Sequence, residues 1–257
     1  MKSKILKTLP RQREVFFSNG IHTNTGHWYA IEKHMRESEL FSNGAVYHVY
    51  NRGADRRNIF LTESDRTRFC KGMIAFNERG RCEPNSISHV RHPSVSANPC
   101  VDIMAYCLMP NHFHLMLKQR ETNGISEFMH RLGGGYAKYF NRTNERKGVL
   151  FAGAYKIKRV TTDAQFQHLP RYIHLNPLEL AGMNYKLGPI AWQDAERFLN
   201  DYRWSSYRHY AGLECQLFIR NEEIIEETSE GSHREFLRGW VERDWKTLDS
   251  FDKKIFG

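Results

Sequence analysis

The sequence MPNHFHLMLK, residues 109–118, contains the strongest structural signal in this chain. A Pro–Asn pair precedes two histidines that flank Phe113, and an apolar run follows them. Successive side chains of an extended strand point to opposite faces, so His112 and His114 share one face. Their Cα atoms would lie about 7 Å apart, close enough for two imidazoles to bind one divalent ion. On spacing alone, an ordinary half-buried strand is an equally good interpretation.

The neighbouring segments place this strand in a larger pattern. Residues 101–108 are almost continuously apolar, as in a central strand, and Pro110-Asn111 would join them to the histidine strand as a hairpin. An earlier strand is expected at 44–51, followed by a helix from Thr62 to about residue 77. Thr62 would cap that helix, and acidic residues occupy its first turn.

A second long helix is expected from Asn123 or Ser126 to about residue 144, and a fourth strand within 151–160. Three glycines at 133–135 predict a break in that helix or a close approach to a neighbour, because each costs about 1 kcal/mol in a helix. The element order β-α-β-β-α-β predicts an α+β fold, a ferredoxin-like antiparallel sheet with helices on one face.

One more helix should begin near Asp163 and stop at Asn176, because Pro177 disfavours its continuation. Pro170 lies inside it and predicts a kink or a restart. Tyr172 and Asn176 are four residues apart and would share one helical face.

Composition limits the class of partner. The 257 residues include 38 Lys and Arg against 29 Asp and Glu, a net charge of +9, which favours nucleic acid over a membrane surface as partner. The first ten residues lack the apolar core of a secretory signal, and the five cysteines show no C-x-x-C spacing. We therefore expect a cytoplasmic protein with reduced thiols. A zinc site at Cys82, His89, His92 and Cys100 is disfavoured by its irregular spacing.

Positive charge is concentrated in two places. Three arginines lie in the turn expected after the first strand: Arg52, Arg56 and Arg57. Eight further basic residues fall between 131 and 159 with one acid, Glu145: Arg131, Lys138, Arg142, Arg146, Lys147, Lys156, Lys158 and Arg159. Aromatic residues are interleaved with the second group: Tyr136, Tyr139, Phe140, Phe151 and Tyr155. Cations with stacking rings are typical of surfaces that bind single-stranded nucleic acid, although a solvated helix beside a core gives the same pattern.

A histidine pair and a basic surface together favour phosphodiester chemistry. The chain shows no activated serine or cysteine, so the nucleophile would be a metal-bound water or a tyrosine. Spacing cannot choose among Tyr136, Tyr139, Tyr155 and Tyr172.

Six segments, in order, resemble the REP-associated tyrosine transposases, a branch of the single-tyrosine HUH transposases linked to repeated palindromes in bacterial genomes. The segments are AVYHVYNRG (45–53), IFLTESDRTRF (59–69), AYCLMPNHFHLMLK (105–118), FMHRLGGGYAKYFNRTNERKGVLFAGAYK (128–156), RYIHLNP (171–177) and DYRWSSYRHYAG (201–212). The resemblance implies that Tyr172 is the catalytic tyrosine and that His112, His114 and Asn176 bind Mg²⁺ or Mn²⁺. It also implies an additional helix that carries the tyrosine.

The expected activity is cleavage and rejoining of single-stranded DNA beside hairpins such as REP-like palindromes, through a 5′-phosphotyrosine and without an organic cofactor or membrane. A bacterial, nucleoid-associated location follows from the same resemblance. We expect a basic N-terminal arm at 1–40 and a transposase-like catalytic domain at 41–212 with a surface insertion at 82–99. Residues 213–257 would form a tail with a short helix near 236–241.

Two alternatives remain at this stage. One is a non-catalytic nucleic-acid-binding regulator derived from such a transposase, and the other is a rolling-circle initiator or relaxase. The oligomeric state stays open.

Overall fold

The structure is a computed structural model that describes residues 41–78, 98–227 and 233–243. The expected N-terminal arm and almost all of the insertion lie outside these residues, as do three of the four side chains of the zinc alternative.

The hairpin expected around the histidines is present. Strand β2 (Val101–Met109) and strand β3 (His112–Gln119) pair antiparallel, and Met109 lies opposite His112 across the turn. Strand β1 (Val46–Arg52) pairs antiparallel with β3 on its other side and with β4 (Lys156–Arg159) at the edge. The resulting sheet order, β2-β3-β1-β4, is that of the predicted ferredoxin-like β-α-β-β-α-β arrangement.

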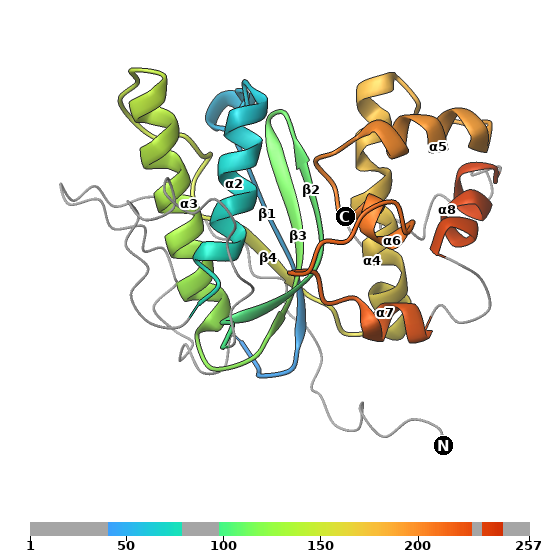
Figure 1. Ribbon diagram of the computed structural model, residues 1–257, viewed down its shortest axis with the longest axis horizontal. Coiled ribbons are helices and arrows are strands. Elements are labelled where there is room, and N and C mark those ends of the chain that lie inside the picture. Colours follow the sequence, from blue (N-terminus) through green and yellow to red (C-terminus); the bar gives the residue numbers. More distant parts are fainter. Residues whose placement is uncertain (1–40, 79–97, 228–232, 244–257) are drawn as a thin grey trace.

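Two helices cover one face of the sheet, helix α2 (Glu63–Ala75) and helix α3 (Gly124–Thr143) (Figure 1). Thr62 caps α2 as expected, since its hydroxyl accepts a hydrogen bond from the Asp65 amide while the Asp65 carboxylate accepts one from the Thr62 amide. The core between these helices and the sheet includes Phe69, Phe113 and Tyr136. Tyr136 also donates a hydrogen bond from its hydroxyl to the Ile59 carbonyl.

The glycine run does not break α3. The helix is continuous from Gly124 to Thr143, and Asn123 precedes it in a left-handed conformation without a side-chain cap. The alternative expectation, a close approach to a neighbour, is correct for Gly135. A Cβ at this position would lie 2.8 Å from Cζ of the buried Phe76 ring at the end of α2. The α2–α3 contact therefore accounts for one glycine, while Gly133 and Gly134 face open space.

The other face of the sheet is covered by helix α4 (Asp163–Leu175), which carries Tyr172 (Figure 1). Leu169 and Ile173 of this helix pack on Met116 and Cys107 of the sheet. Thr162 caps α4, and the helix runs through Pro170 without the restart that the sequence suggested. Leu169 and Pro170 are both buried, so this part of the helix is packed against its neighbours although the proline removes one hydrogen bond.

The α-helix stops within one residue of the position that Pro177 predicted, and the chain then continues as another type of helix. The α-helix ends at Leu175, and a 3-10 helix η3 (Asn176–Ala181) follows directly. Pro177 lies in the first turn of η3, where its missing amide hydrogen is not needed.

The other α-helices of the described residues pack on the α4 side of the sheet: α5 (Trp192–Asp201), α6 (Tyr207–Tyr210), α7 (Glu222–Glu227) and α8 (His233–Val241) (Figure 1). Leu237, Trp240 and Val241 of α8 share a core with Leu175 and Leu199. The short helix expected in the tail is thus α8. The Arg171 guanidinium of α4 stacks on the Trp240 ring, 3.6 Å from its centroid.

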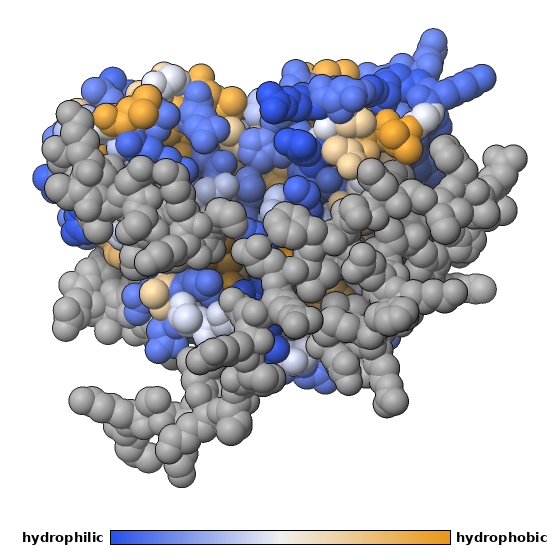
Figure 2. Space-filling view, turned by 180° about the vertical axis from the view of Figure 1, so that it is seen from behind, coloured by the Kyte–Doolittle hydropathy of each residue, from blue (hydrophilic) through white to orange (hydrophobic). Residues whose placement is uncertain are grey.

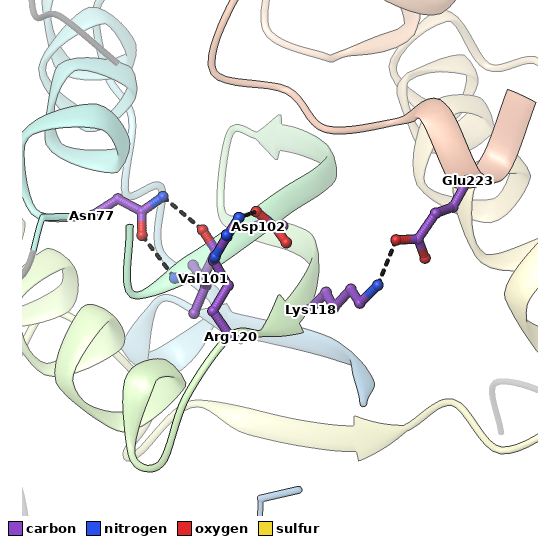
Figure 3. A network of polar contacts seen from close by, with 6 residues as sticks. All are labelled: Asn77, Val101, Asp102, Lys118, Arg120 and Glu223. Atoms are coloured by element: carbon purple, nitrogen blue, oxygen red, sulfur yellow. Dashed lines mark hydrogen bonds and ion pairs between the residues drawn. The ribbon is translucent and has the colours of Figure 1, made fainter. Parts of the chain in front are cut away.

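A polar network fixes the end of the sheet that lies away from the histidines (Figure 3). The Asn77 amide, just after α2, exchanges two hydrogen bonds with the Val101 backbone. Arg120 pairs with Asp102, and Lys118 of β3 pairs with Glu223 of α7. These contacts join α2, the two hairpin strands and α7 at that end of the sheet.

The described surface seen from behind is mostly hydrophilic with small, separate apolar patches (Figure 2). Among the helices described, none is long and apolar enough to cross a membrane. The described cysteines Cys70, Cys100, Cys107 and Cys215 are free thiols.

Candidate active site

His112 and His114 begin β3 and point to the sheet face that α4 covers. The alternation predicted from the sequence is correct, because Phe113 between them belongs to the core under α2 and α3. The two imidazole rings are 5.0 Å apart at their centroids and nearly perpendicular. His114 is buried, whereas His112 is partly exposed at the end of the hairpin.

Tyr172, in the last turn of α4, and Asn176, the residue directly after the helix, reach the same place. The Tyr172 ring lies edge-on to His114, with the ring centroids 5.3 Å apart. The Asn176 amide nitrogen donates a hydrogen bond to the Tyr172 carbonyl at 2.7 Å. The same amide group also contacts the His112 side chain. The shared helical face predicted from their spacing thus points at the histidine pair.

The hydrogen bonds of His112 and Asn176 indicate which atom of each side chain would bind an ion. His112 Nδ1 lies 2.6 Å from the Asn111 side-chain oxygen, which can only accept, so His112 carries its proton on Nδ1. Its Nε2 is then the nitrogen left for a metal. Because the Asn176 amide nitrogen is occupied by the Tyr172 carbonyl, the amide oxygen remains as a ligand. Two imidazole nitrogens and one amide oxygen would supply half of a six-ligand shell for a divalent ion and leave positions open for substrate oxygens.

An acidic cluster does not contribute to this site. Within the described ranges, no group of three or more His, Cys, Asp or Glu side chains could bind an ion. A metal here would therefore depend on the Asn176 amide.

Burial governs the charge of the histidines. It lowers the pKa of His112, against the raising effects of Asn176 and the nearby Glu179 carboxylate. It lowers the pKa of His114 further, and the neighbouring His48 and His112 act in the same direction. Both rings are therefore neutral at pH 7, as metal ligands must be.

The other candidate tyrosines lie elsewhere. Tyr136 is buried in the core under α2 and α3, and Tyr139 and Tyr155 pack against that core. The sheet separates all three from the histidines, whereas the Tyr172 ring contacts His114. Tyr172 also forms part of a small pocket with Asn176, Glu179 and Lys186.

A protein-family model described as "Transposase IS200 like" matches residues 42–176. This segment is more than half of the chain, and it contains both histidines, Tyr172 and Asn176. The chain belongs to the IS200-like transposase family.

Solved structures give weaker likenesses. A REP-associated tyrosine transposase bound to a REP hairpin matches with a TM-score of 0.43 and 13% identity, over 76% of this chain and 93% of that chain. A protein from Deinococcus radiodurans R1, described as a candidate transposase, matches with a TM-score of 0.32 and 14% identity, over 60% of this chain and 95% of that chain. No curated protein matches significantly. Family membership therefore rests on the sequence match.

The basic residues that the sequence suggested for DNA binding do not form one surface. In the strand register, Arg52 lies opposite His112, Lys156 opposite Tyr50, and Lys158 opposite His48. These three basic residues therefore share the sheet face of the histidines. Arg56 and Arg57 lie in the turn after β1, where the Asn111 side chain hydrogen-bonds the Arg56 carbonyl. Arg159 lies opposite Tyr47 and therefore points to the other face of the sheet. The other five lie on α3 or just after it, on the far side of the sheet: Arg131, Lys138, Arg142, Arg146 and Lys147.

The interleaved aromatic residues do not form a base-stacking platform. Tyr136, Phe140 and Phe151 are buried core residues, and Tyr139 and Tyr155 pack against them. On α3, Tyr136 and Phe140 continue the four-residue spacing of Phe128 and Leu132, which is the buried apolar stripe of the helix.

Sequence reasoning missed two residues beside the histidines. His48 and Tyr50 of β1 lie on the same sheet face, and the two rings stack with centroids 4.8 Å apart. The alternation argument applied to 109–118 would have placed them together, but the partner strand of β1 was needed to bring them to His114. Lys186 was also missed, and its ammonium lies 5.6 Å from the Tyr172 ring centroid. The loop sequence around Lys186 contains no signal for that contact.

Proposed function

We propose that this protein cleaves and rejoins single-stranded DNA beside folded hairpins, with Tyr172 as the nucleophile and a divalent ion bound by His112, His114 and Asn176. The contact between the Tyr172 ring and His114, in a chain of the IS200-like transposase family, is the observation that supports it most directly. The bound ion, Mg²⁺ or Mn²⁺, would withdraw charge from an oxygen of the scissile phosphate.

The chemistry balances without an external energy source. The Tyr172 hydroxyl loses its proton and attacks phosphorus, and the bond from phosphorus to the 3′ oxygen breaks. The products are a 5′-phosphotyrosine and a 3′ hydroxyl, which receives a proton. A 3′ hydroxyl can later attack the phosphotyrosine and release Tyr172, so the covalent bond conserves the energy needed for joining.

Side chains around the site have supporting roles in this proposal. Arg52 and Lys156 share the sheet face of the histidines and would hold phosphates on either side of the cleaved one. Lys186 stands over the Tyr172 ring and would offset negative charge that develops at the tyrosine oxygen. Tyr172 itself is held by packing against His48 and His114.

The substrate class rests on the resemblance of the six sequence motifs, which implies recognition of a hairpin such as a REP-like palindrome. One of the solved structures described above was obtained with a REP hairpin bound. Such a substrate would place the protein on chromosomal DNA in the bacterial cytoplasm. The competing proposal is a regulator that keeps the fold and binds DNA without cleaving it.

A covalent-adduct assay tests the proposal. The full chain is incubated with a labelled single-stranded DNA hairpin and Mn²⁺ or Mg²⁺, and a protein–DNA adduct should appear on denaturing gels. Tyr172→Phe should form none. Tyr50→Phe is the matched control, since Tyr50 also lies beside His114, with ring centroids 5.7 Å apart, and burial raises its pKa.

The outcomes separate the alternatives. An adduct that persists in Tyr172→Phe would show that the nucleophile is wrong. A wild-type chain that binds the hairpin equally well with and without metal, and never forms an adduct, would support the regulator instead.

A further inference from the structure

His48 is a polar neighbour of the candidate metal ligands, and its hydrogen bond to His114 has no part in the proposed function. It lies in the middle of β1, buried beneath α4. Its Nε2 is 2.9 Å from Nδ1 of His114, within hydrogen-bonding distance. The two rings are stacked, with centroids 5.1 Å apart and planes 25° from parallel.

The strand register explains this contact. In the antiparallel pair of β1 and β3, Tyr50 lies opposite His114 and His48 opposite Met116. His48 is therefore the diagonal neighbour of His114 on the same face, within reach of a long or aromatic side chain. Stacking on Tyr50 and an edge contact with Tyr172, whose ring centroid is 5.8 Å away, hold the His48 ring in this orientation.

A hydrogen bond between two neutral imidazoles can run in either direction. Either His114 donates from Nδ1 to His48, or His48 donates from Nε2 to His114. In the first case His114 keeps Nε2 unprotonated, and in the second case its proton sits on Nε2. Only an unprotonated nitrogen can bind a metal ion.

The position of His48 leaves His114 Nε2 as the nitrogen available to an ion, because Nδ1 faces His48. We propose that His48 is a positioning residue that accepts the Nδ1 proton of His114 and so holds His114 Nε2 unprotonated towards the ion. This inference rests on the metal site of the proposed function. It gives both ligands the same arrangement, since Asn111 accepts the Nδ1 proton of His112 in the same way.

An imidazole acceptor has a specific consequence. Ligand histidines usually donate their second N–H to a carboxylate, a backbone carbonyl or water. An imidazole that accepts a hydrogen bond is uncharged, because both nitrogens of the protonated ring are donors. A neutral acceptor orients His114 without adding negative charge beside the phosphate that the site must receive.

The tautomer of His114 can be read directly in the metal-free protein. Two-bond ¹H–¹⁵N spectra of histidine side chains distinguish the Nδ1–H form from the Nε2–H form, and the His114 signal is assigned by its loss in His114→Gln. We expect the Nδ1–H form in the wild-type chain. In His48→Asn, whose shorter amide does not reach the Nε2 position, the Nε2–H form should appear. A wild-type His114 in the Nε2–H form would overturn the proposal.

Metal affinity provides a second readout. Manganese binding to the full chain, followed by electron paramagnetic resonance of free Mn²⁺, should weaken about 10- to 100-fold in His48→Asn. His48→Gln should stay close to wild type, because the Gln oxygen can accept at the position of Nε2. The matched control is His233→Gln, which alters the other buried histidine pair, His174 Nδ1 to His233 Nε2 at 2.8 Å, and should leave Mn²⁺ binding unchanged.

Each result has one meaning. Equal Mn²⁺ affinity in His48→Asn, His48→Gln and the wild type would overturn the role of His48. A similar loss in His233→Gln would also overturn it, because the effect would then be a general loss of packing. A wild-type chain with the Nδ1–H form that binds no Mn²⁺ would overturn the metal-dependent function and support the hydrogen-bond direction, so the two failures are distinguishable.

Discussion

Tyr172 of α4 lies edge-on against His114 of β3 in the same chain, with ring centroids 5.3 Å apart. The candidate nucleophile and the candidate ligands therefore come from one polypeptide. A site of this kind can form without exchange of helices between subunits.

This arrangement predicts the outcome of a mixing experiment. Tyr172→Phe and His114→Gln should each be inactive in the adduct assay, and a mixture of the two should remain inactive because neither chain contains a complete site. A mixture of wild type and Tyr172→Phe serves as the control for inhibition by an inactive chain and should keep the activity of its wild-type fraction. Recovery of activity in the mutant mixture would mean that two chains build each site.

The glycine run of α3 gives a matched pair of stability predictions. Gly134→Ala should raise the free energy of unfolding by about 1 kcal/mol, because alanine is the better helix former and meets nothing within 4 Å. Gly135→Ala should lower it by about 1 kcal/mol net, since its Cβ would press on the buried Phe76 ring and overpacking costs about 1–3 kcal/mol. Urea denaturation of both variants measures the difference, and equal effects would contradict the contact with Phe76.

The stack of Arg171 on Trp240 predicts that α8 stabilises the helix that carries Tyr172. Trp240→Ala should destabilise the protein by about 3–5 kcal/mol, because it opens a cavity in the α4 side core and removes the ring from a fully buried guanidinium. Trp240→Phe keeps an aromatic face for Arg171 and should cost clearly less. Thermal or chemical unfolding compares the two, and equal losses would show that the stacking itself contributes little.

Buried histidines predict a loss of stability in mild acid. Burial lowers the pKa of His48 and of His233 from 6.5 to about 3. Between these values the unfolded chain binds protons that the folded chain does not, so stability falls as the pH drops below 6.5. One pH unit below 6.5, each histidine should cost about 1.4 kcal/mol.

The measurement is chemical denaturation of the metal-free protein across that pH range. The variant His233→Gln should lose less stability between neutral pH and one unit below 6.5 than the wild type does. An identical pH dependence in the two proteins would contradict the low pKa of His233.

Local patterns in the sequence were enough to predict much of the fold. The alternation around Phe113, the cap at Thr62 and the order of strands and helices depend on residues close in the chain, and the structure confirms each of them. The continuity of α3 could not be predicted in this way. The reason for a glycine at 135 is likewise not local, since it is the packing of α3 against Phe76, which is 59 positions away.

The candidate site shows the same division. Spacing placed His112 beside His114 and Tyr172 beside Asn176, but it could not bring the two pairs together or reject Tyr136 as nucleophile. That step needs the packing of α4 on one sheet face and of α3 on the other. The partnership of His48 with His114 needs the register of β1 against β3.

The split of the basic residues between two faces of the sheet leads to a prediction about DNA binding. Lys156 shares the face of the histidines, whereas Lys138 is exposed on α3 across the sheet. If single-stranded DNA lies across the candidate site, Lys156→Gln should weaken binding and reduce the slope of log affinity against log salt by about 0.7, the value for one phosphate contact on a single strand. Lys138→Gln removes the same charge and should change the slope little. Fluorescence anisotropy of a labelled hairpin with a single-stranded flank, measured in the Tyr172→Phe background to prevent cleavage, gives both slopes. A larger effect from Lys138→Gln would place the DNA on the α3 side and separate binding from the histidine pair.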